Sequence, residues 1–136
     1  MKYKFIDEIK SDVLFEAYGK NLKELFANAA EALFTVICQL DKVEPKETEE
    51  FEMKGNNLEE TMWNFLSGLI AVVDTEQRFY SKFEVLEADE NHVKVRLHGE
   101  PIVPEKGETV VKSLTNYKYS VEKKDNAYKA TISLDI

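Results

Sequence analysis

Residues 12–40 read DVLFEAYGKNLKELFANAAEALFTVICQL, and this stretch decides the fold. Apolar and polar residues alternate over 12–18, which is typical of a half-buried strand that the following glycine ends. Asn21 then stands at a helix N-cap position, with Glu24 three residues on, as in a capping box. Over 22–39 the apolar residues recur at helical spacing on one side. This pattern predicts a strand followed by a helix that lies on a sheet.

The rest of the chain adds one helix and several strands. A second helix is expected over 58–73, and its wide apolar arc predicts burial on more than one side. Period-two alternation and turn residues predict strands at 2–6, 47–54, 79–88, 92–98, 110–122 and 128–136. We therefore expect an α+β fold with two helices packed on one face of a mixed or mostly antiparallel sheet.

Length and composition favour one globular domain spanning residues 1–136. The chain has 43% apolar residues and one cysteine, Cys38, which cannot form an internal disulfide. Cys38 follows the apolar side of the first helix, so it is expected to be a packed core thiol. No apolar run reaches the length of a membrane span, and no signal-peptide pattern opens the sequence. We expect a soluble cytoplasmic protein without a membrane partner.

The formal net charge is −8. Nucleic-acid binders usually present a net basic surface, because neutralising phosphates releases counterions. Direct binding to RNA or DNA is therefore not expected, although a local basic strand face stays open. An acidic protein more readily meets a basic protein surface or a cation. The chain has no Gly-rich phosphate loop, zinc-type Cys/His spacing or nucleophile elbow, so no enzyme activity is predicted.

The stretch FIDEIKSDV, residues 5–13, places Asp7, Glu8 and Asp12 just before a strand. Hard cations need several oxygen ligands gathered by the fold, and these carboxylates could supply them. The alternative is a charged turn, which residue pattern alone favours. In the last strand Asp135 alternates out of the apolar face, one residue from the end of the sequence. Asp135 and the terminal carboxylate are thus candidate partners for the acidic stretch.

Two further groups carry recognisable chemistry. His92 and His98 share a strand face with two cations, which favours an exposed, mildly basic sheet face over a metal site. Tyr117 and Tyr119 lie among lysines. Such basic-aromatic patches can stack bases, but a solvated strand gives the same pattern and is the favoured interpretation.

Several segments, in order, resemble the archease family. These are FIDEIKSDVLFEAYGKNLKELFANAAEALFTVI, LEETMWNFLSGLIAVVDTEQRFYSKFEV, HGEPIVPEKGETVVKSLT and the closing SLDI. Each is similar to the family segment at the corresponding place, and together they run nearly from end to end. No single motif is decisive; the collinear series carries the resemblance.

The resemblance implies an accessory protein rather than a catalyst. Archeases assist RtcB-type RNA ligases, which join tRNA halves and other RNA ends, by promoting ligase guanylylation and turnover. A chaperone-like role toward a tRNA methyltransferase, without cation dependence, is the alternative. The family carries a divalent cation, typically Ca²⁺, at positions that correspond to Asp12, Asp135 and Ile136 here. Asp7 and Glu8 are possible extra ligands, and Lys112 is a possible contact with the partner protein.

The sequence also departs from the family pattern. The family loop usually reads Asp-His-Thr-Ala-Asp, whereas residues 7–12 are one residue longer and lack the His and Thr. Two more family histidines are replaced, in the segments 106–107 and 115–118. The carboxylate ends of the implied cation site survive. We therefore expect that a cation could be kept while ligase activation is altered or lost.

Overall fold

The computed structural model describes residues 1–7 and 12–136. Its strands and helices follow the predicted order closely. They are β1 (Tyr3–Ile6), β2 (Asp12–Gly19), α1 (Leu22–Ile37), β3 (Glu47–Lys54), α2 (Leu58–Glu76), β4 (Arg78–Ala88), β5 (His92–Pro101), the short 3₁₀ helix η1 (Pro104–Lys106), β6 (Ser113–Lys124) and β7 (Ala127–Asp135).

Asparagine caps begin both helices. The Asn21 side chain accepts a hydrogen bond from the Glu24 N–H at 2.9 Å, and the Asn57 side chain accepts one from the Glu60 N–H at 2.8 Å. Each bond satisfies one of the amides that a helix leaves unpaired in its first turn. The predicted cap of α1 is confirmed. Helix α2 runs three residues beyond its predicted end, to Glu76, and Gln77 follows it in a left-handed conformation.

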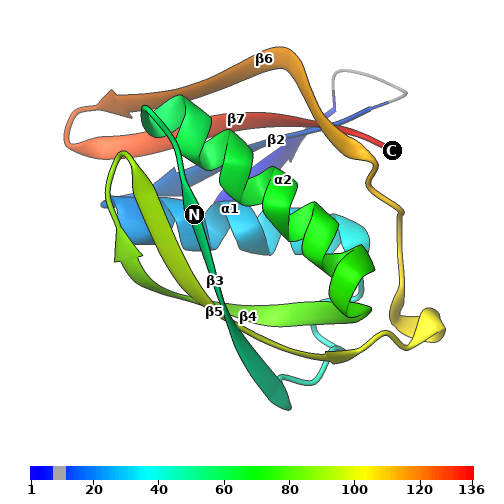
Figure 1. The fold of residues 1–136 in the computed structure, drawn as a ribbon. Helices are drawn as coiled ribbons and strands as arrows, with labels where there is room; N and C mark the ends of the chain where they lie inside the picture. Colours follow the sequence, from blue (N-terminus) through cyan, green and yellow to red (C-terminus); the bar gives the residue numbers. More distant parts are fainter. Residues whose placement is uncertain (8–11) are drawn as a thin grey trace.

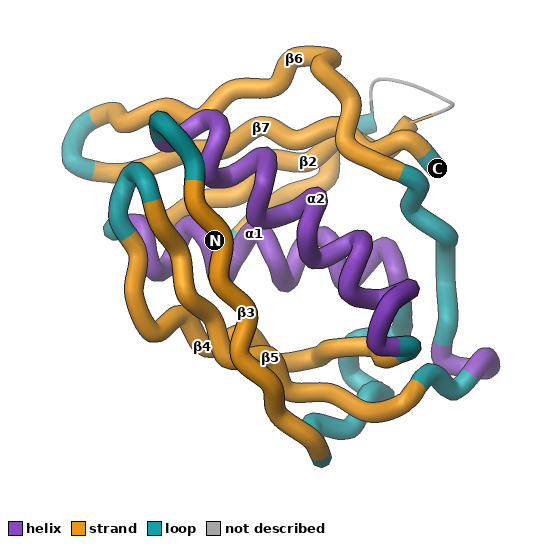
Figure 2. Tube along the Cα trace, in the orientation of Figure 1, coloured by secondary structure: helices purple, strands orange, loops and turns teal. Residues whose placement is uncertain are grey.

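The predicted α+β class is confirmed, but the single predicted sheet is wrong. Two antiparallel sheets are present among the described residues, with strand orders β1-β2-β7-β6 and β3-β5-β4. The two helices lie between them, so each helix faces both sheets (Figures 1 and 2). Alternation shows which face of a strand is buried but not which strand lies beside it, because strand pairing is set over long sequence separations.

The core fills the space between the two sheets. Phe26 of α1 and Phe65 of α2 meet edge to face, with ring centroids 5.2 Å apart. Phe34 of α1 reaches the second sheet, where its ring lies 5.8 Å from that of Tyr80 on β4. Burial of α2 on both sides accounts for its wide apolar arc. Within residues 1–7 and 12–136, neither helix is long and apolar enough to cross a membrane.

Candidate cation and partner-binding site

Asp12 and Asp135 are direct neighbours across two strands. Strand β7 lies between β2 and β6, and the antiparallel register places Asp135 opposite Asp12 on one side and opposite Ser113 on the other. Directly opposed residues in an antiparallel pair project from the same face, with Cβ atoms about 5 Å apart. The start of β2 and the end of β7 therefore bring together two carboxylates that lie far apart in the sequence.

A main-chain hydrogen bond joins Lys112 to this pair. The Lys112 N–H donates to the carbonyl oxygen of Asp135 at 2.8 Å. Lys112 is exposed. Ile136, the residue after Asp135, is exposed as well, with 38% of its surface accessible. The predicted partner contact thus stands directly beside the predicted ligands, at one end of the first sheet.

Two unpaired hydroxyls lie one step inward from the carboxylates. Ser133 is two residues before Asp135, so it shares the same face of β7, and it is opposite Thr115 on β6. The hydroxyl oxygens of Ser133 and Thr115 are buried, and neither has a hydrogen-bond partner among the residues that the structure describes. Buried hydroxyls are normally hydrogen-bonded, so these two oxygens keep a free capacity to accept or donate a hydrogen bond beside the carboxylates.

The donors around the pair suit a hard cation. Carboxylate and hydroxyl oxygens are the ligands that Ca²⁺ and Mg²⁺ prefer. Over residues 1–7 and 12–136, neither Asp12 nor Asp135 is neutralised by an ion pair, and two carboxylates opposed in this way repel one another unless a cation neutralises them. Within the same ranges no three His, Cys, Asp or Glu side chains are gathered as a metal cluster. The other oxygens would have to come from the Ile136 main chain, the two hydroxyls, water or a partner.

The two possible extra ligands have different outcomes. Asp7 is exposed and follows β1 directly, and no contact among the described residues joins its side chain to Asp12 or Asp135. Glu8 lies outside the described residues. The predicted roles of both residues stay predictions, as does cation binding by Asp12, Asp135 and Ile136.

Residues 3–136 match the model of the Archease protein family. The chain belongs to the archease family. The archease of Sulfurisphaera tokodaii is 37% identical over 139 residues, covering 99% of each chain. That of Pyrococcus abyssi is 37% identical over 135 residues, covering 95% of each. The predicted family is therefore confirmed.

Two solved structures show the same fold as this archease. The solution structure of protein 1598 from Methanobacterium thermoautotrophicum has a TM-score of 0.84 and 30% identity, covering 99% of each chain. The crystal structure of a Thermotoga maritima protein, described as an archease and possible chaperone, has a TM-score of 0.69, covering 96% of this chain and 95% of that one. At 17% identity the second likeness shows the fold alone.

The two histidines of this archease lie on the predicted face of the second sheet, but they are half-buried and not exposed. Each ring Nε2 faces a carboxylate, that of Glu52 for His92 and that of Glu84 for His98, the latter at 3.3 Å. Lys94 and Arg96, on the same face, both reach Glu50. The predicted basic face is thus an ion-paired one, because β3 and β4 supply glutamates on either side of β5.

The cysteine and the two tyrosines that the sequence singled out lie in different surroundings. Cys38 is buried, and its burial, with a smaller effect of Glu108, raises the pKa of the thiol to about 12, as suits the predicted core thiol. Tyr117 is exposed, whereas Tyr119 turns inward, where its hydroxyl donates to the Glu59 carbonyl oxygen at 2.5 Å. The predicted solvated strand is wrong for Tyr119. The sequence signal for Ser133 is its place in the polar alternation of β7, on the same side of the strand as Asp135.

Proposed function

We propose that this archease is an accessory protein of an RtcB-type RNA ligase, promoting guanylylation and turnover of the ligase in tRNA splicing or RNA repair. Membership of the family supports the proposal. The single observation that carries it is the cross-strand pairing of Asp12 with Asp135, which joins the two carboxylates that the family resemblance implies as cation ligands.

In this proposal the end of the first sheet is the tip that meets the ligase. Asp12, Asp135 and the main chain of Ile136 would hold a divalent cation, which is Ca²⁺ by the family resemblance and suits an all-oxygen set of ligands. When bound, the cation neutralises the opposed carboxylates and offers exchangeable positions to oxygen atoms of the partner. Lys112 stands beside the pair as a cationic contact for an acidic group of the ligase. The accessory protein supplies no catalytic residue of its own.

The test is a guanylylation assay with a cognate RtcB-type ligase, GTP and the metal that the ligase requires. We expect the wild-type protein to accelerate ligase guanylylation, and Asp12→Asn and Asp135→Asn each to reduce the acceleration at least tenfold. Asp41→Asn, which changes an exposed carboxylate in the α1–β3 loop, is the matched control and should act as wild type. Absence of any acceleration by the wild-type protein would refute the ligase proposal.

The alternative partner is a tRNA methyltransferase bound in a chaperone-like manner. The one observation that favours it is the description of the Thermotoga maritima structure as a possible chaperone. Binding of that kind would not use the carboxylate pair. Co-sedimentation with such an enzyme that is unchanged by Asp12→Ala and Asp135→Ala would support the alternative, and loss of binding in both variants would contradict it.

A further inference from the structure

A cavity of about 350 Å³ opens where both helices end. Ile37 is the last residue of α1, Ile70 and Val73 belong to the last turns of α2, and the chain between η1 and β6 closes one side (Figure 1). The Glu108 N–H donates to the Ile37 carbonyl oxygen at 2.9 Å, which holds that chain segment against the end of α1. The volume of the cavity lies within the range of ligand-binding sites.

The floor of the cavity is core that the fold leaves partly uncovered. Four core residues line it and each keeps 7% or 8% of its surface accessible, whereas most of the core keeps 2% or less: Ile37, Ile70, Phe79 and Val111. Val110, on the rim, is 82% exposed. An exposed valine beside uncovered core is typical of an apolar surface that a ligand or partner covers.

The charged residues of the cavity are acidic. Asp74 and Glu108 line it, and no lysine, arginine or histidine does so among the described residues. Both acidic residues are exposed, and neither belongs to an ion pair within residues 1–7 and 12–136. Apolar walls with unpaired carboxylates at the opening attract a group that is both apolar and cationic.

The helix ends add to this negative charge. The C-terminus of a helix carries a partial negative charge, which a lysine or arginine in the last turn normally stabilises. Neither α1 nor α2 has a basic residue in its last turn, and the last turn of α2 holds Asp74 and Glu76 instead. This arrangement is unfavourable for the fold by itself. A cation brought by a ligand would supply the missing stabilisation.

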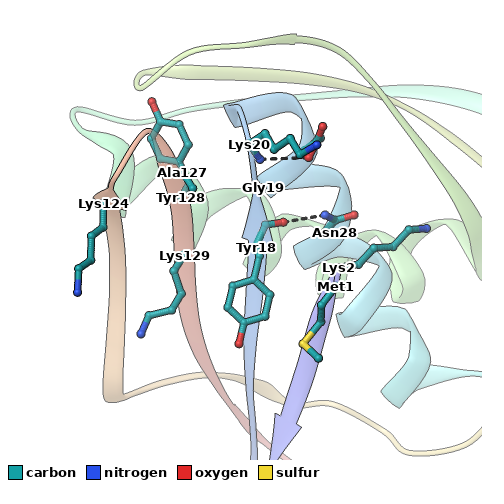
Figure 3. A pocket seen from close by; sticks show the side chains of 11 residues that line it. Met1, Lys2, Tyr18, Gly19, Lys20, Asn28, Lys124, Ala127, Tyr128 and Lys129 are labelled. Carbon is teal, nitrogen blue, oxygen red and sulfur yellow. Dashed lines mark hydrogen bonds between the residues drawn. The ribbon is translucent and has the colours of Figure 1, made fainter.

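A second cavity, at the opposite end of α1, has the opposite character. Its lining holds one glutamate and four lysines (Figure 3): Glu24, Lys2, Lys20, Lys124 and Lys129. Two of these lysines, Lys2 and Lys129, pair with glutamates elsewhere, and the charge that remains does not favour a basic ligand. A ligand that is basic and apolar should therefore distinguish between the two ends of α1.

The acidic cavity lies directly beside the proposed cation site. Val110 and Val111, on its wall, come just before Lys112 in the chain. The Lys112 N–H donates to the Asp135 carbonyl oxygen at 2.8 Å. A protein that covers the Asp12–Asp135 pair therefore reaches the rim of the cavity with the same surface.

We infer that this cavity takes a basic, apolar segment of the partner protein. One large apolar side chain of the segment covers the exposed core, and a neighbouring lysine or arginine faces Asp74 and the helix ends. The choice of a protein segment rests on the proposed function, which places a protein partner on the adjacent carboxylate pair. A second copy of this chain fits less well, because two molecules of net charge −8 repel one another.

The experiment titrates isotope-labelled protein with three octapeptides and follows the amide signals by NMR, without ligase, GTP or calcium. The peptides are GSRLWRSG, its acidic counterpart GSELWESG and its polar counterpart GSRSSRSG. We expect GSRLWRSG to shift the amide signals of Val73, Gly107 and Val111, and the other two peptides to bind at least tenfold more weakly. The signals of Gly19 and Ala127, at the lysine-lined cavity, should not shift.

Charge reversal tests the role of the carboxylates. Asp74→Lys/Glu108→Lys should bind GSRLWRSG at least tenfold more weakly than wild type. The same variant should unfold at a higher urea concentration, because a lysine suits the last turn of α2. The matched control, Glu87→Lys/Glu90→Lys, changes the net charge equally at exposed carboxylates outside the cavity and should lose less than about twofold in affinity.

A further variant tests the apolar part of the cavity. Val110→Ser, at a side chain that makes little contact with the core, should weaken binding of GSRLWRSG about fivefold. Absence of shifts at the cavity with about 1 mM peptide would overturn the inference, and so would equal binding of GSELWESG.

The other possible occupants are separated by two measurements. Phenethylammonium that binds as tightly as GSRLWRSG would indicate a small organic cation and overturn the inference. A wild-type dimer in sedimentation that Val110→Ser dissociates would indicate a second copy of the chain and overturn it too. The peptide titration contains no ligase, and the guanylylation assay changes only Asp12 and Asp135, so the failure of one proposal is distinguishable from the failure of the other.

Discussion

The rings of Trp63 on α2 and Tyr119 on β6 meet edge to face, with centroids 5.0 Å apart and an interplanar angle of 89°. Tyr119 belongs to an irregular part of β6, where the pairing with β7 skips from Thr115 to Ser120. The extra residues let the ring turn toward the helix. This contact fastens the irregular segment of the first sheet to α2.

We predict that Tyr119→Phe lowers the free energy of unfolding by about 1 kcal/mol, because it removes the hydrogen bond to Glu59. Tyr119→Leu should cost about 1 kcal/mol more, since it also removes the aromatic pair with Trp63. Urea unfolding followed by tryptophan fluorescence measures both. Equal costs for the two variants would contradict a stabilising role for the ring pair.

Calcium should stabilise the folded protein through the Asp12–Asp135 pair. Without calcium, Asp12→Asn is expected to raise the free energy of unfolding by about 0.5 kcal/mol, because it removes a like-charge repulsion across the strands. At a free concentration about a hundred times its dissociation constant, calcium should raise the unfolding free energy of the wild type by about 2.7 kcal/mol. The unfolding free energy of Asp12→Asn should not change. Thermal unfolding in EDTA and in calcium tests this. Equal stabilisation of wild type and Asp12→Asn would place the calcium elsewhere.

Gly99 allows β4 and β5 to approach more closely than a side chain would permit. A Cβ atom at this position would lie 1.9 Å from the Phe79 carbonyl oxygen, which is main chain and cannot move aside. Gly99→Ala should therefore cost about 3 kcal/mol or more. Gly107→Ala is the control, because its Cβ would approach the Pro104 carbonyl oxygen only to 3.3 Å, and it should cost under about 1 kcal/mol. Urea unfolding of both variants checks the difference.

Glu100 should make stability depend on pH in the acid range. Its carboxylate accepts hydrogen bonds from Lys106 Nζ and the Glu44 N–H, each at 2.7 Å, and these two contacts lower the pKa of Glu100. A lowered pKa means that the stabilisation is complete above the ordinary value of 4.5 and is lost as pH falls through the lowered one.

Glu100→Gln is therefore expected to lower the free energy of unfolding by about 2 kcal/mol at pH 7. The difference from wild type should shrink steadily below about pH 4, as the wild-type carboxylate becomes protonated. Urea unfolding of both proteins at pH values between about 2.5 and 7 measures this difference in the free energy of unfolding, over a range that spans the titration of a carboxyl group. Glu105→Gln, at an exposed neighbour, should give no such pH dependence, and a constant difference for Glu100→Gln would count against the explanation.

Local chemistry made the elements predictable from the sequence. The cap at Asn21 and the alternation of the strands both act within a few residues, and each lies where the pattern indicates. The division into two sheets could not be read in this way, since β3 pairs with β5 only after the chain has formed α2 and β4.

The candidate site, too, could be predicted only in part from the sequence. The carboxylates Asp12 and Asp135 were predicted from the family resemblance, and alternation in β7 supported the second. Their exact opposition across β2 and β7 is a matter of register, which no local pattern determines. The buried hydroxyl of Thr115 escaped prediction because its place beside Ser133 depends on β6 and β7 meeting in space.

The position of β7 between β2 and β6 has a consequence for synthesis of the protein. As the chain leaves the ribosome, β2 emerges early, but its partner β7 follows all the other strands that the structure describes. Until then β2 has β1 on one side only, and Asp12 faces no second carboxylate. The Asp12–Asp135 pair can therefore form only after β7 has been made, later than both helices and every strand of the second sheet.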